Sequence, residues 1–423
     1  MNARAPKGTT DMLPATARAW EHMTATAQEL FARYGYEPIY TPVFEHTEVF
    51  TRGIGEATDI VSKEMYTFED RAGRSLTLRP EGTASVVRAA LEHTLVPQGS
   101  SAKLYYAGPM FRYERPQKGR MRQFWQIGLE VLGAAEPSAD AEVIVVLWRF
   151  YEALGIPASS MRLLLNSMGD EACRPAYREK VAAYIRSRAA DLCDECNRRL
   201  DTNPLRAFDC KNPACERVME AAPLLRDELC EPCAAHYAEV KTRLEALGIP
   251  YAENPTLVRG LDYYTRTVFE VQADAGLGAQ NAIGGGGRYD RLMEAYGGKP
   301  TPGLGFALGF ERTLLAMEAA GAGVPGPALA DVYVARVDDT VGAEVFAIAS
   351  ELRDAGVAAE LDHQARSLKA QFKQADRLGA RIVVIVGPDE LAAGEVTVRD
   401  MTTKEETRVA VAGVADAVRR MLG

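Results

Sequence analysis

The sequence predicts an α/β protein, of the α+β kind, with two domains, and three observations support this prediction. Within residues 1–325, stretches with helical spacing of apolar groups are mixed with short strand-like runs. Residues 170–250 keep helical spacing alone and contain all seven cysteines, which indicates a helical insertion in the first domain. After a glycine- and proline-rich linker at 321–327, residues 330–423 alternate between strand and helix. That alternation is typical of a small α/β domain with a parallel or mixed sheet.

The elements of the first domain follow from the spacing of its apolar residues. Helical spacing predicts helices at 20–34, 139–154 and 313–319. Alternating or short apolar runs predict strands at 38–42, 76–78, 103–110, 126–132, 257–258, 267–272 and 307–310. Pro42 has no N–H to donate to a sheet, so the strand at 38–42 is expected at a sheet edge.

In the second domain, strands are predicted at 332–337, 358–362 and 382–386, with helices at 341–354 and 367–378 between them. Four cations, Arg366, Lys369, Lys373 and Arg377, are spaced by three, four and four residues, which predicts one basic helix face. Such a stripe suits contact with an RNA backbone. A solvated helix face gives the same pattern.

Composition restricts the classes of function. The chain has 423 residues, of which 47% are hydrophobic and 25% charged, as in ordinary globular proteins. No apolar run approaches the roughly 18 residues needed to cross a bilayer, and the N-terminus lacks an apolar signal region. We therefore expect a cytoplasmic protein with no membrane contact. The net charge of −9 opposes nucleic acid overall, so any RNA contact requires local basic patches.

One such patch lies at 103–122, where six Lys or Arg residues accompany a single Glu. Pro116 and Gly119 predict a turn between two strands, so these charges are expected on a loop. Arginine binds phosphate oxygens through two parallel hydrogen bonds, which suits ATP or an RNA end. A solvated hairpin tip explains a charged run equally well, but Gln126 and Glu130 on the following strand favour a binding site.

Four more segments combine polar groups with turns or glycines: 77–83, 257–265, 284–290 and 302–312. Glu81 and Thr83 stand where a strand gives way to a helix, and they fit either a ligand's ammonium group or a helix cap. The four glycines at 284–287 permit close approach to a ligand, or form a flexible loop; no P-loop pattern follows them. Alone, each segment is weak support for a site.

Together these segments resemble the class II aminoacyl-tRNA synthetases, and within that class the bacterial-type histidyl-tRNA synthetases. The resemblance covers nearly the whole chain. Its motifs are an N-terminal signature at 7–14, motif 1 at 40–42, motif 2 at 111–130, motif 3 at 305–312, and two histidine-specific boxes at 257–264 and 285–290. The presence of both boxes makes the match specific for histidine.

The resemblance implies a class II antiparallel sheet flanked by helices, followed by an anticodon-binding α/β domain. It implies a histidine–tRNA ligase: ATP and L-histidine give histidyl-adenylate and pyrophosphate, and histidine then passes to the 3′ end of tRNA(His). Mg²⁺ on the β- and γ-phosphates and a homodimer are also implied. The alternative is a catalytically inactive, histidine-sensing paralogue, which the presence of the ATP-binding arginines and the second domain disfavours.

The resemblance also implies roles for individual residues. Arg112 and Arg259 are expected to be catalytic, because both would stabilise charge on the α-phosphate. The expected ATP-binding residues are Arg112, Glu114, Arg120, Phe124 and Arg312. The expected histidine-binding residues are Glu81, Thr83, Gln126, Glu130, Arg259, Tyr263, Tyr264 and Tyr289, with Glu130 and Tyr264 on the two imidazole nitrogens. Trp125 and Arg291 depart from the family pattern, which concerns local packing more than activity.

The cysteines include two C-x₂-C pairs, Cys193–Cys196 and Cys230–Cys233, with Cys210 and Cys215 between them. Structural zinc sites use such pairs. The two pairs are separated by more than the common spacing, however, and the family does not require zinc. We therefore expect reduced thiols and no metal ligands here.

Overall fold

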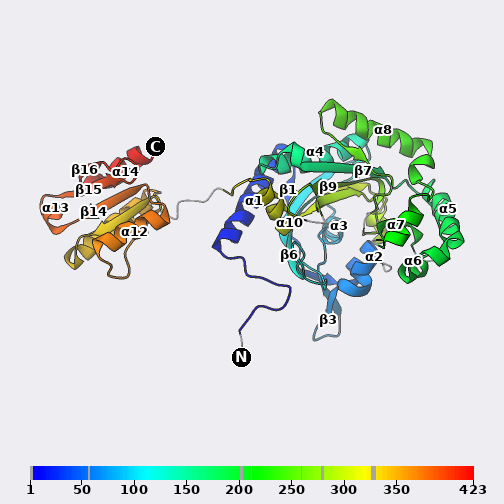
Figure 1. Cartoon of the computed structure of the whole chain (residues 1–423), viewed down its shortest axis with the longest axis horizontal. Helices are drawn as coiled ribbons and strands as arrows, with labels where there is room; N and C mark the ends of the chain where they lie inside the picture. Colours follow the sequence, from blue (N-terminus) through cyan, green and yellow to red (C-terminus); the bar gives the residue numbers. More distant parts are fainter. Residues whose placement is uncertain are drawn as a thin grey trace. The chain divides into compact units, whose positions relative to one another are not determined.

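The computed structural model describes residues 3–55, 58–200, 203–210, 212–258, 260–277, 281–324 and 330–423 (Figure 1). The chain divides into two compact units, Met1–Val324 and Pro325–Gly423. Among the described residues, no helix is long and apolar enough to cross a membrane.

The first unit is built on an eight-stranded sheet. Its spatial order is β1 (Glu37–Pro38), β5 (Ala102–Phe111), β6 (Gln123–Leu132), β11 (Gly303–Gly309), β10 (Ala282–Arg288), β9 (Thr265–Ala273), β7 (Met161–Ser167) and β8 (Ala252–Glu253). The six inner strands pair antiparallel, whereas β1 and β8 pair parallel at the two edges. The expected antiparallel sheet is therefore confirmed, and the strand near Pro42 does lie at an edge, although it is shorter than predicted.

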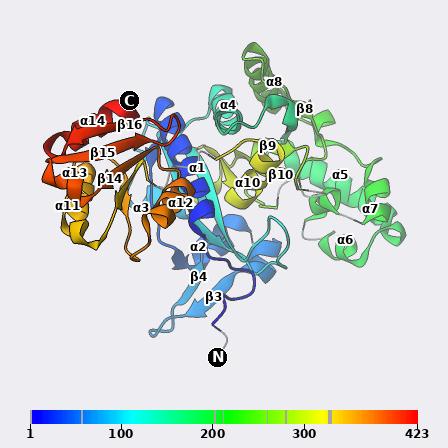
Figure 2. The same ribbon diagram turned by 60° about the vertical axis from the view of Figure 1, so that its left-hand side comes forward.

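The two faces of this sheet carry different side chains, because successive residues of a strand point to opposite sides. Ile127 and Leu129 of β6 belong to a large apolar core with α1 (Pro14–Arg33), α4 (Pro137–Ala153), α8 (Glu231–Ala246) and α10 (Phe310–Ala319). The alternate residue Glu130 contacts α3 (Thr83–Glu92) instead. Smaller elements complete the unit: α2 (Thr47–Ile54), α9 (Leu292–Ala295) and a three-stranded sheet of β2 (Phe44–His46), β4 (Ser75–Leu78) and β3 (Tyr66–Glu69), seen in Figure 2.

Two local expectations were wrong. The glycines at 284–287 form strand β10 rather than a loop, and none of them has a positive φ. These glycines allow the backbones of β10 and β11 to lie close together, since a Cβ on Gly286 would lie 1.9 Å from the carbonyl oxygen of Gly305 on β11. Residues 257–258 form no strand, because the Leu257 N–H donates to the Asn254 carbonyl and closes a turn.

The insertion at 170–250 is helical, as expected. It contains α5 (Arg174–Ser187), α6 (Asp194–Arg199) and α7 (Pro213–Met219), joined by 3₁₀ turns and followed by α8 (Figure 1). The two C-x₂-C pairs do not lie together, which corrects their interpretation as one set. Cys193 and Cys196 lie with Cys210 and Cys215, whereas Cys230 and Cys233, where α8 begins, lie with Cys173 and Asp170.

The second unit has a mixed sheet in the order β13 (Ala359–Leu361), β12 (Val332–Arg336), β14 (Ile382–Val386), β15 (Glu395–Asp400) and β16 (Glu406–Ala410). The first three strands are parallel and the last two antiparallel; β15 and β16 were not predicted. Helices α11 (Gly342–Asp354) and α14 (Val414–Leu422) share one apolar core with this sheet, and α12 (Leu368–Leu378) packs in a second core.

The predicted basic stripe is one residue shorter than expected. Lys369, Lys373 and Arg377 are exposed on α12. Arg366 precedes the helix, and its Nη1 lies 3.3 Å from the buried carboxylate of Asp362, which also accepts the Arg366 backbone N–H at 2.7 Å. The turn that caps β13 therefore holds this arginine away from the helix face.

A buried ion pair ties strand β10 to helix α4. The Arg288 guanidinium and the Asp140 carboxylate are both almost fully enclosed, and Arg288 also donates to the Ala134 carbonyl at 2.9 Å. His236 Nε2 of α8 lies 3.2 Å from the same carboxylate. Burial opposes ionisation of Asp140, but the hydrogen bonds from His236 and Arg288 outweigh it and hold the pKa of Asp140 below its usual value.

Substitution Asp140→Asn would remove the buried counter-ion of Arg288 and leave only the partly exposed Asp290, 3.1 Å away. We expect the free energy of unfolding to fall by about 3–5 kcal/mol, as for other broken buried pairs. Denaturant titration at neutral pH measures this change. Glu142→Gln on the same helix, which breaks a half-exposed pair with Lys103, is the control and should cost only about 0.2–1 kcal/mol. Equal losses in the two variants would contradict the assigned importance of the buried pair.

Candidate active site

A cavity of about 220 Å³ opens on the face of the large sheet that α3 covers. Eleven of the thirteen predicted site residues line it: Glu81, Thr83, Arg112, Glu114, Arg120, Phe124, Gln126, Tyr263, Tyr264, Tyr289 and Arg312. Glu130 lies beneath it, in contact with two of them. Arg259 is outside the described residues, so its position is not part of this geometry. Segments separated by up to 230 residues in sequence thus meet at one cavity.

Three arginines gather in this cavity. Arg312, at the start of α10, donates to the carbonyls of Gly119 and Ala282 at 3.1 and 3.0 Å, so its side chain is held by backbone on two sides. Burial, with repulsion from Arg120 and Arg112, lowers the pKa of Arg312. The cavity therefore concentrates positive charge, which suits a polyanion such as a triphosphate.

Glu114 and Phe124 accompany these arginines. The Glu114 carboxylate lies 3.1 Å from Arg120 and 3.9 Å from Arg112, so it partly balances both charges. The Arg112 guanidinium lies over the Phe124 ring, 5.2 Å from its centroid, and donates to the Pro80 carbonyl at 2.8 Å. An aromatic ring that lines a cavity beside cations is suited to stacking against a flat base.

The predicted histidine-binding residues centre on the carboxyl group of Glu130. This group is fully buried; it accepts a hydrogen bond from Thr83 Oγ1 at 2.6 Å and a short one from the Tyr289 hydroxyl. Burial raises the pKa of Glu130 from 4.5 to about 8, so the free protein holds it protonated at neutral pH. Gly305 on β11 makes room for it, since a Cβ there would lie 1.9 Å from the carboxylate.

The sequence left open whether Glu81 and Thr83 cap a helix or face a ligand, and the structure gives the two residues different roles. Glu81 caps α3, because its carboxylate accepts the backbone N–H groups of Thr83 and Ala84 at 2.8 and 2.9 Å. Thr83 therefore is not the cap, and its hydroxyl serves Glu130. Gln126 Oε1 is buried and accepts no hydrogen bond from the described residues, so this acceptor fits a donor group of a ligand.

The three tyrosines form an aromatic wall. The Tyr263 ring lies 4.8 Å from that of Tyr264 and meets that of Tyr289 edge-on at 5.6 Å. The insertion holds the backbone at Tyr264 in place, since Arg174 of α5 donates to the Tyr264 carbonyl at 2.7 Å. Tyr289, not Tyr264, makes the short contact with Glu130. The insertion thus contributes to the shape of the cavity.

Two groups in or beside the cavity were not among the predicted site residues. Glu311 lines it, both its carboxylate oxygens accept the Trp125 N–H, and burial raises its pKa to about 7. The Tyr106 hydroxyl is buried 3.5 Å from Glu130. The Glu-Arg pair at 311–312 was a visible signal for the first, whereas Tyr106 sits in an apolar strand with nothing to single it out.

The two departures from the family pattern lie away from the cavity lining. Trp125 packs against the Trp20 ring of α1 at 4.8 Å. Arg291 pairs with Glu171 at 2.9 Å and with Glu294. Both substitutions are therefore accommodated by local packing and surface ion pairs.

The raised pKa of Glu130 predicts a pH effect on stability. The folded state keeps this proton between about pH 4.5 and 8 whereas the unfolded chain loses it, so stability falls as pH rises through that window. Glu130→Gln cannot ionise, and it should flatten the decline by up to about 1.4 kcal/mol per pH unit. Denaturant titrations of both ligand-free proteins from pH 5 to 8 measure the difference. Parallel curves would mean that Glu130 ionises normally.

Comparison with known proteins shows the family of this chain. Residues 8–313 match the family described as Histidyl-tRNA synthetase, and residues 331–421 match the Anticodon binding domain. Proteins named histidine–tRNA ligase from Moorella thermoacetica and Anaeromyxobacter dehalogenans are each 51% identical, covering 98% and 99% of this chain and 98% and 100% of theirs. The ligand-free histidyl-tRNA synthetase of S. aureus superposes with a TM-score of 0.83 at 38% identity, over 98% of this chain and 99% of that one. The chain belongs to the histidyl-tRNA synthetase family.

Proposed function

We propose that this protein activates L-histidine with ATP and transfers it to tRNA(His), with the residues predicted from the sequence in the roles given there. The observation that carries the proposal is the meeting, in one cavity, of three arginines with a buried carboxyl group and an aromatic wall. The first set suits a triphosphate and the second a small polar ring, and an adenylate needs both.

In the first step, a carboxylate oxygen of histidine attacks the α-phosphorus of ATP, the bond to the β-phosphate breaks, and pyrophosphate leaves. Negative charge grows on the α-phosphate oxygens, where Arg112 and Arg259 would stabilise it without a general base. Arg312 and Arg120 would bind the departing phosphates, and Phe124 with Glu114 the adenine. The backbone carbonyls that hold Arg312 keep its guanidinium in place before ATP arrives.

Histidine would be selected by buried polar groups that line or underlie the cavity, of which Gln126 Oε1 has no hydrogen-bond partner among the described residues. Gln126 Oε1 and the capping carboxylate of Glu81 suit the ammonium group, and Glu130 with Tyr264 suits the two imidazole nitrogens, beside Thr83, Tyr263 and Tyr289. An analogue lacking either nitrogen would leave a buried polar atom without a partner, which discriminates strongly.

Magnesium ions, when bound with ATP, neutralise charge on its β- and γ-phosphates. The residues present fit such an ion, because Mg²⁺ in nucleotide sites commonly needs only one or two carboxylates beside the phosphates. Glu311 lines the cavity next to Arg312, and burial raises its pKa to about 7 against the opposing attraction of Arg312, so a further cation would stabilise the carboxylate. Glu311 would therefore be its protein ligand.

In the second step the 3′ end of tRNA(His) attacks the adenylate carbonyl and releases AMP. The second unit would hold the anticodon, with Lys369, Lys373 and Arg377 of α12 along the RNA backbone.

We also propose a homodimer in the cytoplasm. A histidine-sensing paralogue without activity is not favoured, since Arg112, Arg120 and Arg312 all line the cavity.

Amino-acid-dependent exchange of pyrophosphate into ATP tests the first step. Supplied one at a time, only histidine should support exchange. Arg259→Ala and Arg312→Ala should each lower kcat/KM by about 100-fold or more, because each removes charge stabilisation of the transition state. Arg162→Ala, which removes an exposed arginine of β7, is the matched control and should leave the rate unchanged. No exchange from folded protein that still binds histidine would favour the regulatory alternative.

The basic stripe predicts a separate defect in tRNA use. Lys369→Glu/Lys373→Glu should lower kcat/KM for aminoacylation of tRNA(His) by about 10-fold or more at low salt while exchange stays normal, because phosphate contacts are lost. Arg408→Glu/Arg420→Glu changes the net charge equally on β16 and α14, outside the core that α12 forms, and serves as the control. Equal defects in both variants would mean that the loss comes from the change in overall charge and not from the basic stripe on α12.

A further inference from the structure

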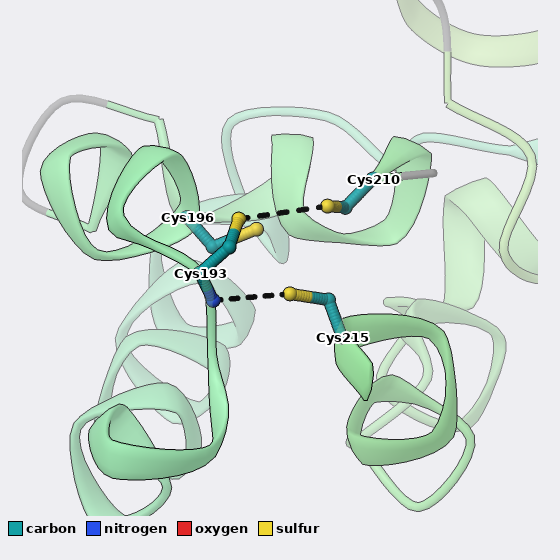
Figure 3. A group of neighbouring side chains, drawn as sticks. All are labelled: Cys193, Cys196, Cys210 and Cys215. Atoms are coloured by element: carbon teal, nitrogen blue, oxygen red, sulfur yellow. Dashed lines mark hydrogen bonds between the residues drawn. The ribbon is translucent and has the colours of Figure 1, made fainter. Parts of the chain in front are cut away.

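The helical insertion contains a group of four cysteines that the proposed chemistry does not use. Cys193 and Cys196 belong to the turn that begins α6, Cys210 follows a 3₁₀ turn at Pro204–Asp209, and Cys215 lies in α7. Figure 3 shows the four side chains pointing toward one another from these separate turns. Their sulfur atoms all lie within 4.8 Å of one another.

We propose that Cys193, Cys196, Cys210 and Cys215 bind a structural Zn²⁺ ion in a tetrahedral site. The order of the ligands is C-x₂-C, thirteen residues, then C-x₄-C, which lies in the range of structural zinc sites. The long separation that argued against zinc applied to the pair at 230–233, and that pair lies in a different group.

The distances favour a metal over a disulfide. Around zinc with Zn–S bonds of about 2.3 Å, the edge of the tetrahedron between two sulfurs is about 3.8 Å. Cys193 Sγ and Cys210 Sγ are 3.9 Å apart, nearly twice the length of a disulfide bond. All seven cysteines are free thiols in this structure. The sulfurs are therefore spaced for an ion between them rather than for a bond between any two.

The surrounding backbone is arranged for thiolates. The Cys193 N–H donates to Cys215 Sγ at 3.2 Å, an arrangement that favours a thiolate at this sulfur. Cys196 and Cys215 are 2% and 0% exposed, which makes this a closed site without an open position for substrate.

The short elements around the cysteines also need a cross-link to stabilise them. α6 and α7 have six and seven residues, and helices this short have little stability of their own. The segment between Cys196 and Cys210 nevertheless makes specific contacts with the catalytic unit. Asn203 donates to the Asp262 carboxylate at 2.7 Å, directly before the tyrosines of the cavity, and Arg199 and Arg206 pair with Asp59. Zinc would hold this segment in place.

The second group, Asp170 with Cys173, Cys230 and Cys233, is less suited to zinc. It offers three sulfurs, and its fourth member already pairs with Arg266 at 3.2 Å. Any measurement of bound metal must nonetheless distinguish this second group from the four-cysteine group. The proposal therefore concerns the four-cysteine group alone, and it does not depend on the proposed catalytic activity.

The test measures the zinc content of full-length protein purified without a histidine tag and under reducing conditions, by mass spectrometry of the metals. Cys230→Ser/Cys233→Ser removes the second group, and this variant should retain about one zinc ion per chain. Adding Cys193→Ser/Cys210→Ser to this variant should abolish zinc binding and lower the melting temperature. Cobalt in place of zinc should give thiolate-to-metal absorption in the Cys230→Ser/Cys233→Ser variant but not in the variant that carries all four substitutions. Absence of zinc from the first variant, or iron in its place, would overturn the proposal.

If the serine variants do not fold, crystals of the unaltered protein provide the second test. Anomalous scattering at the zinc edge should give a peak equidistant from the four sulfurs. No peak there, or a peak only beside Cys230 and Cys233, would overturn the assignment. In a folded Cys193→Ser/Cys210→Ser protein, we expect KM for histidine to rise several-fold with a smaller change in kcat, because Asn203 no longer holds Asp262.

Discussion

A continuous series of polar contacts crosses the core of the first unit, and the cavity depends on it. His236 of the insertion contacts Asp140, Asp140 pairs with Arg288, and the next residue, Tyr289, donates to Glu130. Polar and charged groups this deep are tolerated only when they have partners. Helices α4 and α8 and strands β6 and β10 are therefore fixed relative to one another by electrostatic requirement as well as by apolar packing.

The arrangement explains why the insertion matters to a site built on the sheet. Arg174 and Asn203 reach from it to Tyr264 and Asp262, so the wall of the cavity is supported by a segment with few long elements of its own. The arginines have a different support, backbone carbonyls at Gly119, Ala282 and Pro80. The tyrosine wall and the arginines of the cavity thus have separate structural supports that share one sheet.

Much of this was predictable, and the misses have physical causes. Helices at 20–34 and 139–154 follow from one apolar face each, and the site residues from motifs. Strand β10 was missed because glycine has no side chain to show alternation, and its pairing depends on closeness to β11. The grouping of the cysteines was wrong because spacing along the chain does not say which turns meet in space. The sequence left the roles of Glu81 and Thr83 open because both stand where the helix begins, and spacing does not show which side chain accepts its first N–H groups.

The missing side chain at Gly305 has a consequence for how specificity can change. Glu130 occupies the space where that side chain would be, and Leu129 backbone is 2.3 Å from the same point. At residue 305 the wall is already main chain, so no substitution there can trim it further. A side chain at this position can only crowd Glu130 and narrow the space. More room on this side would need a shorter residue at 130, which removes the buried carboxyl group, or strands that move apart.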